Sequence, residues 1–171
     1  MLARTNRPRI KISLSLPDWI LEVISVAFIL IGIILLVVWY KNLPDQVVTH
    51  FNSKGEPDGF GNKSTLFLLP AFALFIYILI TIVSFFPHYF NFPVKITEKN
   101  AEVQYRLAIR MLRVIKAMII IIFTYLNYQT ILTTTGKESG IGIVFLPVFL
   151  LLLTGSMIVY LVLSFNNRYI D

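Results

Sequence analysis

The sequence predicts an all-α integral membrane protein with four transmembrane helices, both termini in the cytoplasm, and a short ordered extracytoplasmic loop between the first two helices. The first observation is composition: 57% of the 171 residues are hydrophobic and 14% are charged, whereas soluble domains have about 25% charged residues. The second is that the apolar residues gather into four blocks of about 20 residues, the length that a helix needs to cross about 30 Å of hydrocarbon. The blocks lack the alternating polarity of membrane β-strands.

We expect one membrane domain, 1–171, made of nine segments. These are a basic cytoplasmic tail (1–18), transmembrane helices (19–40, 64–86, 114–134 and 141–165), an extracytoplasmic motif loop (41–63), an amphipathic cytoplasmic connection (87–113), an external turn (135–140) and a cytoplasmic tail (166–171). The first block follows a basic stretch, as a secretion signal would. It is longer than a 7–15-residue signal core and ends in Trp39-Tyr40 without a small-residue cleavage site, so we expect a retained helix.

The third observation is the distribution of the cations. With the amino terminus inside, eleven Lys and Arg residues are cytoplasmic: Arg4, Arg7, Arg9, Lys11, Lys95, Lys99, Arg106, Arg110, Arg113, Lys116 and Arg168. Four are external: Lys41, Lys54, Lys63 and Lys137. Cytoplasmic loops are enriched in cations, so this distribution predicts the orientation in a bacterial inner membrane. The net charge of +6 then has the anionic inner leaflet as its partner, and no nucleic acid is expected.

Polar residues within the apolar blocks are few. Glu22 lies about one turn from the cytoplasmic end of the first helix, where it reaches headgroups or pairs with a basic neighbour. We expect Ser64 to cap the second helix. Asn127 and Ser156, in the third and fourth helices, are expected to make interhelical hydrogen bonds, because unpaired polar groups are costly in hydrocarbon. The alternative is a substrate path.

The connection 87–113 carries the pattern of an amphipathic helix. Thr97 is the expected N-cap. Ala101, Tyr105, Ala108 and Leu112 form an apolar stripe, and Arg106, Arg110 and Arg113 form the opposite, basic face. The helix either lies on the inner leaflet or leads straight into the third span. Its basic face is either a topology determinant or a docking site for a soluble partner.

The external loop combines β-favouring residues at 47–52 with turn formers at 53–61. We expect a short extended segment, tight turns with glycines at positive φ, and then the second helix. His50, Asn52, Glu56 and Asp58 offer ligand atoms, but their spacing matches no metal signature, so neither a metal nor a cofactor is expected. Hydrolase, metalloprotease and phosphate-loop patterns are absent, which argues against an enzyme.

The loop as a whole resembles a family of bacterial membrane domains of unknown function. The shared pattern is Leu-Pro-Asp-x-(Val/Ile)-x-x-His-Phe-Asn-x-x-Gly-x-Pro-Asp-Gly-(Phe/Tyr)-Gly-x-Lys between two helices, here residues 43–63. The matching residues are Pro44, Asp45, His50, Phe51, Asn52, Gly55, Pro57, Asp58, Gly59 and Lys63. A similar domain forms the amino-terminal part of SdpI-type proteins, which provide immunity and signalling in the sporulation-delaying toxin system. The resemblance implies a membrane protein that binds a toxin outside or holds a regulator at the inner leaflet.

The leading hypothesis is a non-enzymatic membrane protein that binds a protein partner through the loop and the basic helix, as an immunity-type protein or accessory subunit; the sequence leaves the oligomeric state open. Within the loop, His50, Asn52 and Asp58 are the expected working surface. The main alternative is a small transporter with a polar path along Tyr77, Thr81, Asn127 and Ser156 between helices two, three and four. A third hypothesis, a metal-assisted enzyme, requires an ion at His50.

Overall fold

The structure, a computed structural model, describes residues 7–169 of the chain. Arg4 and part of each predicted cytoplasmic tail, 1–18 and 166–171, lie outside the described residues. The helices are α1 (Leu16–Trp39), α2 (Leu68–Val83), α3 (Ala101–Thr134) and α4 (Phe145–Asn166). Two strands, β1 (Gln46–Phe51) and β2 (Pro57–Asn62), lie between α1 and α2, and single 3₁₀ turns occupy Tyr40–Asn42, Lys63–Phe67 and Pro87–Tyr89.

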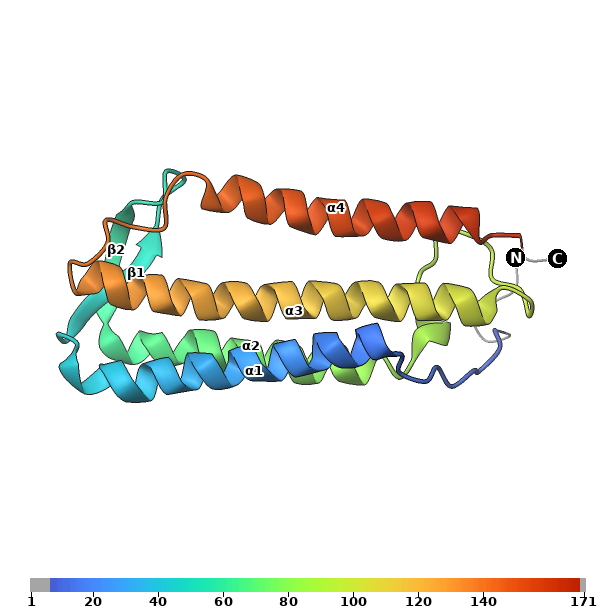
Figure 1. Cartoon of the computed structure of the whole chain (residues 1–171), viewed down its shortest axis with the longest axis horizontal. Coiled ribbons are helices and arrows are strands. Elements are labelled where there is room, and N and C mark those ends of the chain that lie inside the picture. Colours follow the sequence, from blue (N-terminus) through green and yellow to red (C-terminus); the bar gives the residue numbers. More distant parts are fainter. Residues whose placement is uncertain (1–6, 170–171) are drawn as a thin grey trace.

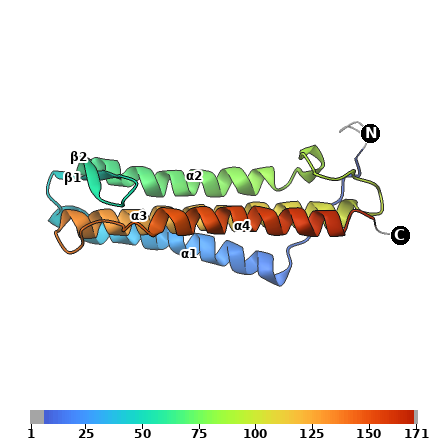
Figure 2. The same cartoon turned by 90° about the horizontal axis from the view of Figure 1, so that it is seen from above.

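The long helix α3 is the centre of the bundle. Figure 1 shows α4 along one side of α3 and the pair α1 and α2 along the other, with the β1–β2 hairpin at one end. Seen from above in Figure 2, α1 and α2 diverge on either side of α3. At about 1.5 Å per residue the 34 residues of α3 span about 50 Å, longer than the about 30 Å of a hydrocarbon core.

The chain is mostly helical, as the sequence predicts, and three helical segments are long and apolar enough to cross a membrane: Leu16–Asn42, Lys63–Val83 and Phe145–Asn166. Their outward faces carry large apolar side chains, such as Val37 (73% exposed) and Leu151 (70% exposed), that only an apolar medium would cover. These segments indicate a membrane protein. A fourth span at 114–134 and the orientation of the termini stay predictions.

Of the two predicted helix caps, one is wrong. The side chain of Asn62, not Ser64, caps the turn before α2, accepting a hydrogen bond from the Ser64 amide at 2.9 Å. Helix α3 starts after Asn100, whose side chain makes no cap hydrogen bond to the helix. Thr97 caps the turn that leads into it: the Asn100 amide donates to Thr97 Oγ1, and the Thr97 amide donates to Asn100 Oδ1.

The amphipathic connection leads straight into α3 rather than ending as a separate surface helix. Ala101 and Tyr105 are fully buried in a small core with Ile96, against which Phe92 and Ile10 pack. The Tyr105 hydroxyl donates to the Pro8 carbonyl at 3.1 Å. Burial raises the pKa of the Tyr105 phenol, so this donor keeps its proton near neutral pH. The apolar stripe is therefore covered by the chain itself.

The hairpin is a departure from the all-α prediction. The strands β1 and β2 pair antiparallel with Val47 opposite Gly61 and His50 opposite Gly59, and the register is irregular on both sides of His50. The second strand is rich in Pro, Asp, Asn and Gly, which are depleted in strands, so propensity does not predict it. It forms because β1 is fixed to the bundle: Val47 is fully buried against Leu36 of α1 and Ile131 of α3.

Candidate functional site

A clasp between Asp45 and Lys63 closes the base of the hairpin. The Lys63 ammonium lies 3.0 Å from Asp45 Oδ1, and the Lys63 amide donates to the Asp45 carbonyl at 2.9 Å. The same ammonium lies over the Tyr40 ring at the end of α1. This predicted pair of motif residues therefore joins the two ends of the loop to the bundle and has a structural role.

Asn52 organises the tip of the hairpin. Its side-chain oxygen accepts hydrogen bonds from the amides of Lys54 and Glu56, and its amide group donates to the Glu56 carboxylate at 3.1 Å. Gly55, at the turn, has φ +81°, and a Cβ there would lie 2.5 Å from the Gly142 carbonyl oxygen. Only glycine fits this position, because the α3–α4 loop passes against the turn. Both motif residues thus shape the backbone.

Gly59 brings the two strands close at His50. A Cβ at Gly59 would lie 2.8 Å from the His50 Cβ, so the glycine makes room for the histidine. His50 Nδ1 and Asp58 Oδ1 form an exposed pair, with 69% and 44% of their side chains accessible. The contact joins β1 to β2 on the exposed face of the hairpin. His50 and Asp58 thus form a polar pair of the motif that stays accessible to a partner.

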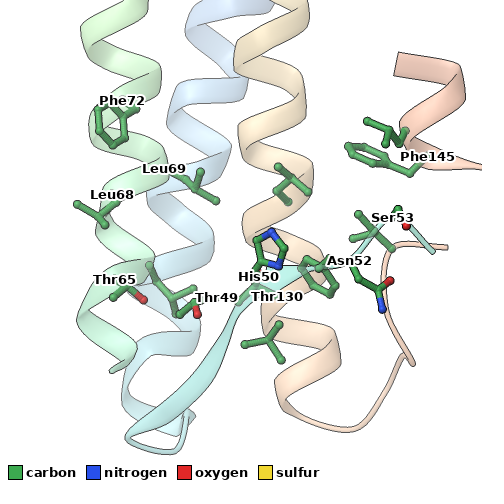
Figure 3. A pocket seen from close by; sticks show the side chains of 16 residues that line it. Thr49, His50, Asn52, Ser53, Thr65, Leu68, Leu69, Phe72, Thr130 and Phe145 are labelled. Carbon is green, nitrogen blue, oxygen red and sulfur yellow. The ribbon is translucent and has the colours of Figure 1, made fainter. Parts of the chain in front are cut away.

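A cavity of about 720 Å³ lies beside the hairpin and brings His50 and Asn52 to one edge. Its walls come from β1, the start of α2, the end of α3 and the start of α4, and they include Leu69, Phe72 and Phe145. Figure 3 shows His50 in front of α3, between the α2 side chains and Phe145. The cavity has apolar walls and a polar edge, so it suits an amphipathic ligand, and its size lies within the usual range of binding pockets.

Of the remaining motif residues, Phe51 lines the cavity, whereas Pro44 and Pro57 do not. Pro44 is exposed before β1, and Pro57 opens β2 opposite Phe51. Phe51 is half-buried and lines the cavity with His50. The motif thus divides into residues that build the hairpin and residues that face the cavity.

The predicted basic face of the connection is largely paired within the fold. Arg106 pairs with Glu102 at 2.8 Å, Arg110 donates to Ser15 and Asp18, and Arg113 contacts Asp18. The side chain of Arg113 is only 12% exposed. The three arginines therefore do not form one open surface, because Glu102 of α3 pairs with Arg106 and Asp18 of α1 pairs with Arg110 and Arg113.

An ion-pair network joins α1 to α3, and sequence reasoning missed its centre. We use this name for Asp18, Glu22, Arg110, Arg113 and Lys116. Lys116 is fully buried, and its ammonium donates to both oxygens of Glu22 at 2.8 Å. The sequence did contain a sign of this network: the three cations are spaced i, i+3, i+6 and the two acids i, i+4, so each set lies on one helix face. Only the packing of α1 on α3 brings the acids to the cations.

The ammonium of Lys116 also meets α2. It donates to Thr81 Oγ1 at 3.0 Å and lies 4.4 Å from the centre of the Tyr77 ring. Two of the four residues proposed for a polar path therefore gather at a buried charge. The sequence analysis counted Lys116 among the cytoplasmic cations and gave it no such role.

Asn127 and Ser156, the other two residues of the proposed polar path, make no hydrogen bond to Lys116. Asn127 is fully buried, yet neither of its side-chain polar atoms has a hydrogen-bond partner among the described residues. Ser156 donates to the Leu153 carbonyl of its own helix. The expected interhelical hydrogen bonds of both residues are therefore wrong: among the described residues the Asn127 amide is buried without a partner, and the Ser156 hydroxyl bonds one turn back in its own helix.

Helix α4 is instead held by a pair that the sequence analysis did not single out. Gln104 of α3 and Ser164 of α4 are both fully buried, and the Gln104 amide donates to the backbone carbonyls of Ser164 and Asn167. The Ser164 hydroxyl donates back to Gln104 Oε1. Their sequence separation of 60 residues gives no local signal. Within residues 7–169, no three His, Asp or Glu side chains gather as a metal site would require.

Comparison with known proteins supports a relationship over α1, the hairpin and the start of α2. Residues 27–74 match the model of a family described as "Domain of unknown function (DUF1648)". An "Uncharacterized protein" of Archaeoglobus fulgidus is 40% identical over 62 residues, which cover 32% of this chain and 34% of the relative. The chain thus spans about a third of the length of this curated relative. No solved structure matches the chain. The similarity is therefore to a domain of unknown function that contains the loop motif.

Proposed function

We propose that this chain is a non-enzymatic membrane protein that binds a protein or peptide partner on its external face, as an immunity-type protein or an accessory subunit. The observation that supports this most is the exposed His50–Asp58 pair beside the 720 Å³ cavity. The partner would place an apolar segment against Leu69, Phe72 and Phe145 and a polar group at His50. The resemblance of residues 43–63 to the amino-terminal domain of SdpI-type proteins, which provide immunity in a toxin system, supports the same proposal.

The proposal includes a bacterial inner-membrane location, a fourth span at 114–134 and cytoplasmic termini. Without Lys116, which lies within the proposed fourth span, ten cytoplasmic cations against four external ones support this orientation. The hairpin and the network of Asp18 and Lys116 lie at opposite ends of the bundle, so one orientation places the cavity outside and the cationic end at the inner leaflet. The loop then faces an extracytoplasmic partner.

The experiment that tests the function is affinity purification of the tagged full-length chain from native membranes in mild detergent. The variants are His50→Ala, Asp58→Asn and Phe72→Ala, which change the polar pair and the apolar wall separately. Lys54→Ala is the matched control, because Lys54 is exposed on the same hairpin and its side chain makes no ion pair among the described residues.

We expect a stoichiometric partner with the wild type and with Lys54→Ala, and at least a tenfold smaller yield with His50→Ala and with Phe72→Ala. Retention of the same partner by every variant contradicts the proposal for this cavity. Absence of any partner from the wild type, when the chain is properly folded, contradicts the interaction function as a whole.

A transporter is the second candidate, and the buried Lys116–Glu22 pair favours it. Ionisable residues inside a membrane bundle are rare and commonly mark ion or substrate pathways. Tyr77 and Thr81 contact Lys116, which gives helices α1, α2 and α3 a shared polar centre. The path would run through this centre and not through Ser156.

Proteoliposomes that contain a pH-sensitive dye test the second candidate. A transporter that uses the pair as a proton site gives a proton flux above that of empty liposomes, and Glu22→Gln removes the flux. Equal flux with and without protein argues against proton-coupled transport. Lys137→Gln is the control, because Lys137 is a cation at the opposite end of the bundle, over the Trp39 ring.

A further inference from the structure

A second cavity lies at the end of the bundle away from the hairpin. It has a volume of about 410 Å³ and is formed by the segment before α1, the start of α1, the end of α2 and the first half of α3. Lys11, Glu22 and Arg113 are its charged lining residues, and Thr81 and Ser84 add hydroxyls. The site is separate from the proposed partner cavity, with which it shares no lining residue.

The charged groups at this cavity carry an excess of positive charge. In the ion-pair network, three cations meet two carboxylates: Asp18 contacts Arg110 and Arg113, and Glu22 contacts Arg113 and Lys116. Both carboxylates are therefore satisfied several times over. Lys11 is exposed and makes no ion pair among the residues that the structure describes, so it adds a further uncompensated cation.

Arg113 keeps donors for another acceptor. Its Nη1 atom lies 3.3 Å from Asp18 Oδ1 and its Nε atom lies 3.3 Å from Glu22 Oε1. Because a guanidinium carries five N–H donors on three nitrogens, these two contacts use only part of its donor capacity, and Arg113 lines the cavity. A phosphate group matches this requirement, since its oxygens accept from arginine and lysine together.

The rest of the cavity wall is apolar and continues onto the outer surface of the bundle. Ile10, Ile12, Leu14, Trp19 and Phe85 line it. Trp19 is 55% exposed and Phe85 is 73% exposed, and both belong to or border segments apolar enough to span a membrane. A ligand that joins a phosphate to a long hydrocarbon chain satisfies both parts of the wall.

We propose that this cavity binds an anionic phospholipid, with the headgroup phosphate at Lys11 and Arg113 and an acyl chain along Trp19 and Phe85. Cationic pockets between membrane helices at the cytoplasmic side are suited to such headgroups. Under the orientation proposed above, the cavity faces the leaflet that contains anionic lipids. The lipid site itself does not depend on that orientation or on the external partner.

Native mass spectrometry of the purified full-length chain tests the site. The protein in mild nonionic detergent is titrated with palmitoyl-oleoyl phosphatidylglycerol or with the matching phosphatidylcholine, which has the same chains and a zwitterionic headgroup. We expect the dissociation constant of phosphatidylglycerol to be at least about fivefold lower than that of phosphatidylcholine. This is the difference expected when one Lys or Arg side chain attracts the anionic headgroup. Equal binding of the two lipids would overturn the proposal.

Variants locate the headgroup. Lys11→Gln is expected to weaken phosphatidylglycerol binding about fivefold, whereas Lys11→Arg retains it. Lys99→Gln is the matched control, since Lys99 is an exposed cation at the same end that does not line the cavity. An equal loss with Lys99→Gln shows attraction to the general surface and contradicts the site. Because Lys11 is exposed and unpaired, its variants do not disturb the ion-pair network.

A competition arm separates the lipid from a soluble anion. Excess inorganic phosphate is added to the protein loaded with phosphatidylglycerol, and lipid retention is compared with that in excess chloride at equal ionic strength. Retention of the lipid in both supports an acyl-chain contribution to binding. Displacement by phosphate alone shows a soluble phosphate site and overturns the lipid proposal.

Discussion

Lys116 of α3 places its ammonium 2.8 Å from both carboxylate oxygens of Glu22 in α1, across 94 residues of sequence. Lys116 is completely buried and the side chain of Glu22 is 14% exposed. The contact is a buried ion pair between two helices of a membrane bundle. Such a pair costs desolvation when it forms, but breaking it by removing one partner leaves an uncompensated buried charge.

Lys116→Met is expected to destabilise the chain by about 1–3 kcal/mol, because Glu22 loses its hydrogen bonds to Lys116 but keeps its contact with Arg113. The double variant Lys116→Met/Glu22→Gln should recover part of this loss, since the buried carboxylate that lost the ammonium is then removed as well. Thermal unfolding in detergent measures both. Lys99→Met, at an exposed cation, is the control and should stay within about 0.5 kcal/mol of the wild type. A wild-type melting temperature for Lys116→Met would show that the pair contributes no net stability.

Asn127→Leu is expected to be neutral or to stabilise the bundle by about 1–2 kcal/mol. The buried amide of Asn127 has no hydrogen-bond partner among the described residues, so its replacement by an apolar side chain of similar size removes a desolvation cost. Thr124→Val is the comparison: Thr124 donates to the Phe28 carbonyl at 2.9 Å, and its loss should cost about 1 kcal/mol. Both are read from thermal unfolding. Marked destabilisation by Asn127→Leu would reveal a polar partner at this position.

Gly55→Ala should disrupt the hairpin much more than Gly136→Ala. Both glycines have positive φ, at +81° and +72°, so both alanines are strained by about 1 kcal/mol. Only Gly55 also has a close neighbour, because its added Cβ would meet the Gly142 carbonyl, whereas nothing lies within 4 Å at Gly136. Hydrogen exchange of the β1 and β2 amides measures the difference. Equal exchange in the two variants would mean that the α3–α4 loop does not pack on the turn.

Single-cysteine labelling tests the proposed orientation without interference, because the chain contains no cysteine. Lys54→Cys on the hairpin should react with a membrane-impermeant maleimide in intact cells. Lys99→Cys at the other end should react only after the membrane is opened. Reversal of this pattern would place the hairpin in the cytoplasm and would contradict the external partner proposal, while the lipid titration in detergent would remain valid.

Much of the helical fold follows from local sequence. Apolar blocks of membrane length predict helices at the positions of α1, α2 and α4, because burial of a hydrophobic stretch in lipid requires that its backbone hydrogen bonds close within the segment. The loop motif is only partly explained locally: of the glycines expected at positive φ, Gly55 has φ +81° in a turn, whereas Gly59 and Gly61 lie in β2 without positive φ, so the turn expected at Asp58-Gly59 is wrong. The second strand could not be predicted, because its residues disfavour strands and only the docking of Val47 fixes its partner.

The candidate site was likewise predictable in part from the sequence and in part only from the tertiary structure. The sequence singled out His50 and Asp58 as chemistry-bearing residues, and the fold leaves this pair exposed beside a cavity. The cavity itself has walls from four separate elements, so no sequence window contains it. Arg113 shows what the sequence could not predict: its spacing on an amphipathic helix indicated a basic face, either a topology determinant or a docking site, but Asp18 and Glu22 of α1 contact it.

The sequence by itself determined the class of protein, the helical blocks and the chemistry of the loop, because hydrophobicity, turn preference and charge are properties of short segments. The tertiary structure alone decided that Lys116 pairs with Glu22, that Gln104 binds Ser164, and that two cavities open at opposite ends of the bundle. The two side-chain pairs join residues 94 and 60 positions apart, and each cavity has walls from several separate segments. These arrangements are set by how α1, α2 and α4 pack around α3, and no local pattern encodes them.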